Sequence, residues 1–210
     1  MKKSNSSKQW LRRHVNDPYV QKSKREGYRS RSAYKLIEID DRDRLLKGGQ
    51  VVVDLGAAPG GWSQVLAKRV PSGTVVAIDL LEMEPVAGVT FVRADFTRLA
   101  GLKAVRTALG DRTADLVLSD MAPNLSGIAL SDQARSMELA EAARDFALAH
   151  LAPDGAFLVK IFQGAGYDEY LVSLRRAFVK VVVRKPDASR DESAEQYLLA
   201  KGLKGLKPQS

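Results

Sequence analysis

Acidic side chains stand at the ends of three short apolar segments, where they could bind the hydroxyl and amino groups of a nucleoside. Asp54 lies in the segment over residues 51–55, Asp79 closes residues 74–78, and Asp95 follows residues 89–93. Asp79 stands 19 residues beyond Gly60, a spacing at which an acidic side chain can accept hydrogen bonds from ribose hydroxyls. Asp95 could accept a hydrogen bond from an adenine edge. The pattern predicts a ligand that contains a nucleoside.

A glycine-rich turn, Gly56-Ala57-Ala58-Pro59-Gly60-Gly61, follows the first of these segments. Its glycines let the backbone turn tightly and approach a ligand closely, because they lack Cβ. The dinucleotide pattern G-x-G-x-x-G fails because Ala stands at position 58. A phosphate-binding loop fails because Trp62 stands where lysine is needed. The turn therefore disfavours a dinucleotide-dependent oxidoreductase and excludes a P-loop enzyme.

Two lysines and two further acids could act on a hydroxyl group. Asp120 follows a predicted strand over residues 115–119, and Lys160 lies inside the apolar run of another. A lysine in such a run is costly to bury unless it is paired or emerges at a functional edge of the sheet. Lys35 lies on a predicted helix, and Glu192 and Glu195 both precede the last predicted strand.

The elements that must position these residues alternate between strand and helix. Strands are predicted over residues 51–55, 74–78, 89–93, 115–119, 156–161, 178–184 and 196–201, and helices over 33–44, 62–70, 98–109, 132–150 and 168–177. Short apolar strands alternating with helices indicate a doubly wound α/β fold, with a mostly parallel seven-stranded sheet covered on both faces. The last two strands lie too close together for a helix between them, so one of them should run antiparallel.

The composition excludes several classes of protein. The chain has no cysteine and only two histidines, which excludes disulfides and thiolate catalysis and makes a metal site improbable. No stretch resembles a signal peptide or a membrane span. We therefore expect a soluble cytoplasmic protein without a metal.

Basic charge is concentrated at the two ends of the chain. Residues 1–35 carry a net charge of +9, residues 36–174 of −6 and residues 175–210 of +5. Aromatic side chains alternate with the cations of residues 1–35, which suits looped or single-stranded RNA, because cations meet phosphates and aromatic rings stack on bases. We interpret residues 1–30 as a basic RNA-binding arm with one short helix at most, ahead of a domain over residues 31–210. The RNA-binding candidates are Arg12, Arg13, Lys22, Lys24, Arg25, Arg29, Arg31 and Tyr34.

Three strings along the chain resemble the FtsJ/RrmJ family of RNA 2′-O-methyltransferases. They are Asp54-Leu55-Gly56-Ala57-Ala58-Pro59-Gly60-Gly61-Trp62-Ser63-Gln64, Ser119-Asp120-Met121-Ala122-Pro123-Asn124 and Val159-Lys160-Ile161-Phe162-Gln163-Gly164. Arg29-Ser30-Arg31-Ser32-Ala33-Tyr34-Lys35-Leu36 and Val183-Arg184-Lys185-Pro186 are also similar to the family. The resemblance covers essentially the whole chain.

The resemblance implies a class I methyltransferase Rossmann-like fold and S-adenosyl-L-methionine as the methyl donor. It implies a catalytic tetrad of Lys35, Asp120, Lys160 and Glu195, with Glu192 as the alternative acid. It also implies that the donor pocket is formed by Asp54, Gly56, Pro59, Gly60, Gly61, Trp62, Asp79, Asp95 and Asp120. The similarity is strongest to bacterial members that methylate a uridine ribose in the A-loop of 23S ribosomal RNA, so the expected partner is ribosomal RNA in the 50S subunit, bound by a monomer.

Two other functions stay open at this point. A transfer-RNA 2′-O-methyltransferase of the same superfamily would share every physical feature described above. A non-catalytic RNA-binding factor that assists ribosome assembly would share the fold, although an intact tetrad argues against it.

Overall fold

The computed structural model describes residues 17–205 except 111, 125 and 191. Two of the predicted RNA-binding residues, Arg12 and Arg13, lie outside the described residues.

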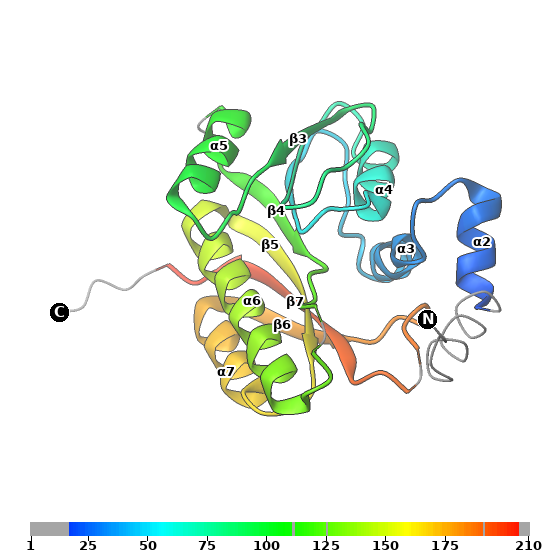
Figure 1. The fold of residues 1–210 in the computed structure, drawn as a ribbon. Helices are drawn as coiled ribbons and strands as arrows, with labels where there is room; N and C mark the ends of the chain where they lie inside the picture. The colour runs from blue at the N-terminus through cyan, green and yellow to red at the C-terminus, as the bar shows by residue number, and fades with distance from the viewer. Residues whose placement is uncertain (1–16, 111, 125, 191, 206–210) are drawn as a thin grey trace.

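A seven-stranded sheet in the order β3-β2-β1-β4-β5-β7-β6 forms the centre of the molecule (Figure 1). Every neighbouring pair is parallel except those made by β7, which runs antiparallel to both β5 and β6. The predicted α/β sheet with one antiparallel strand near the C-terminus is thus confirmed. The strands are β1 (Val51–Leu55), β2 (Thr74–Asp79), β3 (Val89–Arg93), β4 (Ala114–Ser119), β5 (Leu151–Phe162), β6 (Phe178–Arg184) and β7 (Glu195–Leu203).

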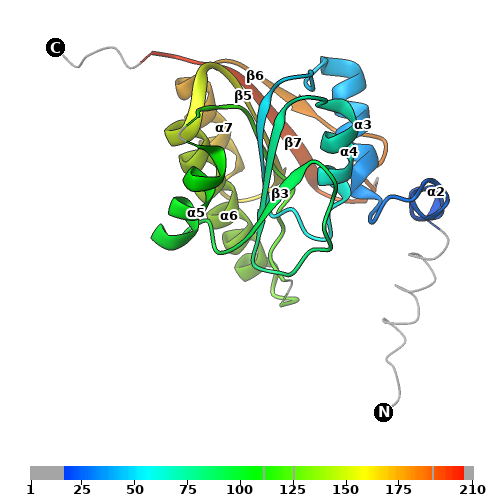
Figure 2. The ribbon, with the colours of Figure 1, turned by 90° about the horizontal axis from the view of Figure 1, so that it is seen from above.

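Helices cover both faces of this sheet, as Figure 2 shows from above. One face packs against α3 (Ser32–Asp43) and α4 (Gly61–Arg69), through a core that includes Leu36, Trp62 and Leu66. The other face packs against α5 (Leu99–Leu109), α6 (Ala129–His150) and α7 (Tyr167–Ala177). Successive strand residues point to opposite faces, so Val52 joins the first core and Val53 the second. Strands buried on both faces explain the continuous apolar runs in the sequence.

β5 begins at Leu151, before the strand predicted over residues 156–161, and its first part contains an irregularity. Ala114 pairs with Leu151 and Leu116 pairs with Ala156, so β5 carries extra residues between two points of contact with β4. Proline and glycine in that stretch mark a bulge here rather than the start of the strand.

The first described helix, α2 (Pro18–Glu26), packs beside α3. Asp17 caps it by accepting hydrogen bonds from the backbone N–H groups of Tyr19 and Val20. The Tyr19 hydroxyl donates to Glu38 at 2.9 Å, and the Tyr34 hydroxyl donates to Glu26 at 2.8 Å. Residues 17–30 therefore lie against the domain. No helix in the described part of the chain is long and apolar enough to cross a membrane.

Candidate active site

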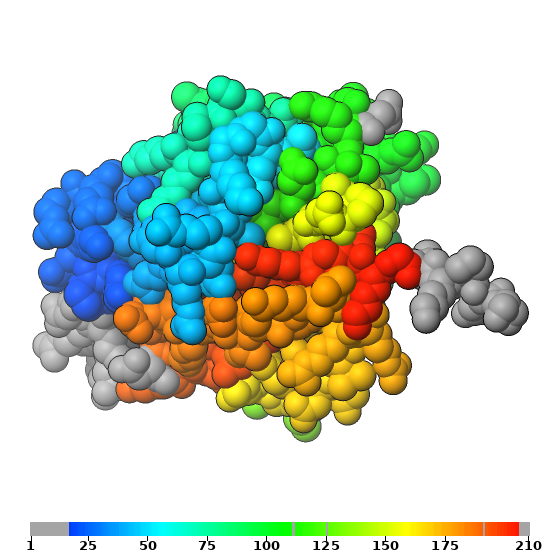
Figure 3. Space-filling view, turned by 180° about the vertical axis from the view of Figure 1, so that it is seen from behind, coloured from blue at the N-terminus to red at the C-terminus, as the bar shows by residue number. Residues whose placement is uncertain are grey.

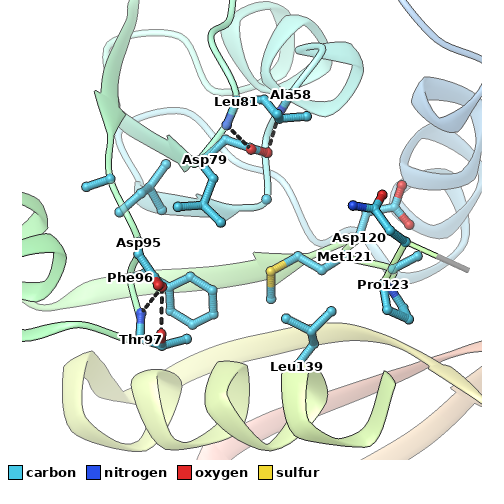
Figure 4. A pocket seen from close by; sticks show the side chains of 16 residues that line it. Ala58, Asp79, Leu81, Asp95, Phe96, Thr97, Asp120, Met121, Pro123 and Leu139 are labelled. Atoms are coloured by element: carbon cyan, nitrogen blue, oxygen red, sulfur yellow. Dashed lines mark hydrogen bonds between the residues drawn. The ribbon is translucent and has the colours of Figure 1, made fainter. Parts of the chain in front are cut away.

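A cavity of about 400 Å³ opens beyond the carboxyl ends of the central strands, where a doubly wound sheet places its ligands (Figure 4). Asp79 and Asp95 lie on one side of it and Asp120 lies on the other. Its apolar wall includes Phe96 and Leu139. The strand ends predicted from the sequence thus meet at one cavity.

The carboxylates on the first side are oriented by the backbone. Asp79 accepts hydrogen bonds from the N–H groups of Ala58, at 2.9 Å, and Leu81, at 2.8 Å. Asp95 accepts from both the N–H and the hydroxyl of Thr97, and these bonds lower the pKa of its carboxyl. Because an ionised carboxylate offers about four acceptor positions, both groups keep capacity for a ligand.

Asp54 lies beneath the cavity rather than on its wall. Its side chain accepts a hydrogen bond from the Ser63 hydroxyl at 2.7 Å, and the residue is 1% exposed. Burial raises the pKa of the Asp54 carboxyl to about 7, and the charges of Asp120 and Asp79 add to the effect. Asp54, Pro59, Gly61, Trp62 and Asp120 line a second, smaller cavity of about 40 Å³ that also touches Gly56.

The glycine turn is approached closely by the chain's own side chains. Gly56 has a φ of 74°, and a Cβ there would overlap Cγ of Met121. In Figure 4 the Met121 side chain points into the cavity. Gly60 has a φ of 105°, and a Cβ there would lie 2.7 Å from Nη1 of Arg29. Both glycines have a positive φ, which other residues rarely adopt, and a larger residue would also displace Met121 at position 56 and the Arg29 guanidinium at position 60.

The four tetrad residues form two ion pairs at the same edge of the sheet. Lys160 Nζ lies 3.2 Å from Oδ1 of Asp120 and donates a hydrogen bond to the Asp120 carbonyl oxygen at 2.6 Å. Lys35 Nζ lies 2.6 Å from Oε1 of Glu195. Both lysine side chains are largely buried, so each charge is offset by a carboxylate in a region with little water.

Tyr197 joins the two ion pairs, although it is not among the predicted site residues. Its hydroxyl donates to Oδ1 of Asp120 at 2.6 Å, while Lys35 Nζ lies 5.8 Å from its ring centroid. Burial raises the pKa of Tyr197 well above its usual value, and the neighbouring carboxylates act in the same direction. Its position two residues after Glu195 on a strand, and so on the same face, is the signal that could have identified it.

Glu195, rather than Glu192, occupies the position expected of the tetrad acid. Glu195 is 7% exposed and accepts a hydrogen bond from the Ser189 hydroxyl at 2.9 Å in addition to its ion pair with Lys35. Glu192 is exposed.

The predicted RNA-binding residues within the described chain divide into two groups. Lys24 and Arg25 are exposed on α2, and Lys22 lies with Nζ 4.4 Å from the Tyr34 ring centroid. Tyr34 is 2% exposed, so the expectation that its ring stacks on an RNA base is wrong for this conformation. Its ring holds α2 against α3, packed beside Tyr19 and Tyr28.

Arg29 and Arg31 are engaged within the protein. Arg29 donates hydrogen bonds to the carbonyl oxygens of Pro59 at 3.2 Å, Glu84 at 2.6 Å and Pro85 at 2.9 Å. Arg31 forms an ion pair with Asp17 and donates to the carbonyl oxygen of Ala188. Arg29 thus contacts the glycine turn, and its role in RNA binding stays a prediction.

No group of three or more acidic or histidine side chains in the described residues could hold a metal ion.

Comparisons with known proteins agree on one family. The model of the FtsJ-like methyltransferases matches residues 28–203. "Ribosomal RNA large subunit methyltransferase E" of Dechloromonas aromatica is 57% identical over 97% of this chain and 100% of its own length, and the protein of the same name from Pseudomonas aeruginosa is 52% identical over 98% and 100%. The crystal structure of a ribosomal RNA methyltransferase from Plasmodium falciparum is similar at a TM-score of 0.75 and 29% identity, covering 84% of this chain and 98% of that one.

Proposed function

The chain belongs to the FtsJ-like methyltransferase family, and from this premise we propose that it methylates the 2′-hydroxyl of a uridine ribose in 23S ribosomal RNA. The single observation that carries the proposal is the pair of lysine–carboxylate contacts, joined by Tyr197, beside a cavity at the strand ends. Large-subunit ribosomal RNA is the substrate named for the relatives described above.

The large cavity has the chemistry that S-adenosylmethionine needs. Asp79 and Asp95 offer oriented acceptors for ribose hydroxyls and for an adenine amino group, and Phe96 supplies an apolar surface for a base. The carboxyl groups of Asp54, Asp79 and Asp120 lie close enough to interact, and together they favour a positively charged ligand. When bound, the donor supplies a methyl group on a positively charged sulfur.

The tetrad would position the acceptor and remove its proton. Methyl transfer to a hydroxyl oxygen releases one proton. Lys160 Nζ would first release its own proton to solvent and would then accept that of the hydroxyl while the new carbon–oxygen bond forms. The ion pair with Asp120 stabilises the ammonium that results, and Tyr197 keeps the carboxylate in place. Lys35 and Glu195 would hold the ribose on the other side. Holding both reactants in line is the largest contribution that such a site makes.

The remaining parts of the proposal concern the RNA partner, its setting in the ribosomal subunit and the oligomeric state of the protein. The cations of residues 1–30, including Lys24 and Arg25 on the exposed side of α2, would bind the RNA backbone. We propose that the substrate is presented in the 50S subunit in the cytoplasm and is bound by a monomer.

The proposed function is tested by transfer of labelled methyl groups. The purified protein is incubated with labelled S-adenosylmethionine and 23S RNA, 50S subunits or transfer RNA, each from a strain that lacks the enzyme, and the modified nucleotide is mapped. We expect label in a ribose of 23S RNA or of the 50S subunit. Label in transfer RNA would assign the other substrate class, and no label with any RNA would leave the protein as a non-catalytic binding factor.

A further inference from the structure

A separate recess, of about 290 Å³, lies beside Lys35 and Glu195 of the tetrad. It is lined by Arg31, Lys35, Arg190, Ser193 and Glu195. None of these residues lines the large cavity, while Lys35 and Glu195 are shared with the tetrad. A group bound in this recess would therefore touch the residues that hold the acceptor ribose.

The described residues of the recess carry more positive than negative charge. Three cations line it, against the one carboxylate of Glu195. Asp17 contacts two of these cations, because it pairs with Arg31 and lies 3.6 Å from Nε of Arg190. Among the described residues named here, two carboxylates therefore face three cations.

Arg31 shows directly that the local hydrogen bonding is incomplete. Its Nε is buried and, within the described part of the chain, has no hydrogen-bond partner. Burial lowers the pKa of the Arg31 guanidinium, and the neighbouring charge of Arg190 lowers it further. The guanidinium groups of Arg31 and Arg190 share the single carboxylate of Asp17, so a second oxygen anion would balance the positive charge that this carboxylate leaves.

The loop that carries Arg190 is held in place by the chain around it. The N–H of Ala188 donates to Glu38 on α3 at 3.0 Å, the N–H of Ser193 donates to the Arg190 carbonyl oxygen at 3.0 Å, and Lys185 donates to the Ser193 carbonyl oxygen. Figure 3 shows the segment after β6 lying against the part of the chain that forms α2 and α3. The cations are therefore presented on a formed surface.

We propose that this recess binds one phosphate of the substrate RNA, at the nucleotide that carries the methylated ribose or directly beside it. The inference rests on the proposed function, because it takes RNA as the substrate. Arginine is suited to this ligand, since its planar fork donates two hydrogen bonds to one phosphate. The contact fixes the register of the RNA, so that one ribose and not its neighbour meets Lys160.

The test uses Arg190→Gln in the full-length protein, with Arg176→Gln as the matched control. Arg190 is 48% exposed, so its replacement should leave the fold intact, and Arg176 is an exposed arginine on α7, on the other face of the sheet. RNA affinity is measured over a range of salt concentrations with the hairpin that contains the mapped nucleotide. Losing one phosphate contact should weaken binding by about tenfold. It should also reduce the slope of log affinity against log salt by roughly one.

A second experiment identifies which phosphate of the RNA is bound. Neutral methylphosphonate linkages on 2′-deoxy sugars are placed one at a time around the target nucleotide, and binding is measured with both proteins. We expect one linkage adjacent to the target sugar whose neutralisation weakens binding by the wild type by about tenfold but has no further effect on Arg190→Gln.

Three results would overturn the proposal while leaving the proposed function in place. The first is an unchanged salt slope in Arg190→Gln, and the second is an equal change in Arg176→Gln. The third is that every neutral linkage weakens RNA binding by Arg190→Gln as much as it weakens binding by the wild type. Methyl transfer by the wild type to the same hairpin is measured first, and its absence would overturn the proposed function together with this inference.

Discussion

The guanidinium of Arg29 crosses directly over the backbone of Gly60. Its three hydrogen bonds reach the carbonyl oxygens of Pro59 in the glycine turn and of Glu84 and Pro85 in the segment that follows β2. Because a Cβ at residue 60 would displace Nη1, Arg29 and Gly60 form one contact that ties the end of the arm to the glycine turn and to the segment after β2.

Replacing Arg29 should therefore weaken donor binding. Arg29→Gln cannot reach all three carbonyls, and the glycine turn would lose its connection to the segment after β2. We expect the affinity for S-adenosylhomocysteine, measured by calorimetry, to fall by about tenfold, the effect of losing charge-assisted hydrogen bonds. Gly60→Ala should reproduce the loss, because the new Cβ displaces the same guanidinium.

The same variants separate this role from direct RNA contact. Because the Arg29 charge is already engaged within the protein, the salt dependence of RNA binding should change little in Arg29→Gln. Unchanged donor affinity combined with a smaller salt slope would instead support the RNA-binding role that the sequence predicted.

Tyr197→Phe removes one hydroxyl and keeps the buried ring. Asp120 then loses the hydrogen bond at 2.6 Å that holds its Oδ1, and Lys160 loses a well-positioned partner. The single-turnover rate should fall by about tenfold while the KM for the donor changes little. If the KM for the donor rose by the same factor as the rate fell, or if the rate equalled that of the wild type, the hydroxyl would not position the tetrad.

Lys160 is the proposed proton acceptor, so its replacement should slow methyl transfer without weakening the binding of donor or RNA. Lys160→Ala leaves no amine, and Lys160→Arg places a cation that does not give up its proton at neutral pH. Single-turnover rates of both variants should be lower by about 10²- to 10⁴-fold, the usual contribution of general base catalysis. Near wild-type rates in either variant would contradict the assignment.

Asp54 should make stability depend on pH in an unusual direction. Its folded pKa is about 7, whereas an unfolded aspartate has a pKa of about 3.9. The folded protein therefore holds this proton more tightly, and its stability decreases as pH rises from about 4 to 7. Between pH 5 and pH 8 the carboxyl should cost the folded state about 3 kcal/mol.

Asp54→Asn removes this dependence, since the amide does not titrate and can still accept a hydrogen bond from Ser63. The free energy of unfolding by urea is compared with that of the wild type at pH 5 and pH 8, with Asp154→Asn on the exposed bulge of β5 as the control. A difference between wild type and Asp54→Asn that is the same at both pH values would mean that Asp54 is ionised throughout.

Much of the fold could be predicted from the sequence, because strands buried on both faces leave continuous apolar runs and acids at their ends. Asp79, Asp95 and Asp120 converge on one cavity for that reason. Lys160 could be identified because a lysine inside such a run needs a partner, and Asp120 is that partner.

The remaining parts of the site depend on packing between distant segments. Tyr34 lies among cations in the sequence, but α2 folds back on α3 and buries its ring. In the sequence Arg29 resembles an RNA-binding arginine, but in the fold it donates hydrogen bonds to three carbonyl oxygens of other loops. Arg190 meets Arg31 only because the segment between β6 and β7 packs on α3. Local periodicity contains no information about such contacts.

Because β7 is antiparallel, Glu195 of the tetrad and the residues of the large cavity come from different parts of the sheet. A strand that runs against its neighbours brings its first residues, Glu195 and Tyr197, to the edge where the parallel strands end, and the segment over 185–194 comes with them. The donor cavity is built from the other half of the sheet. If that segment holds the RNA as proposed, its length and charge could change without any change in the half of the sheet that forms the large cavity.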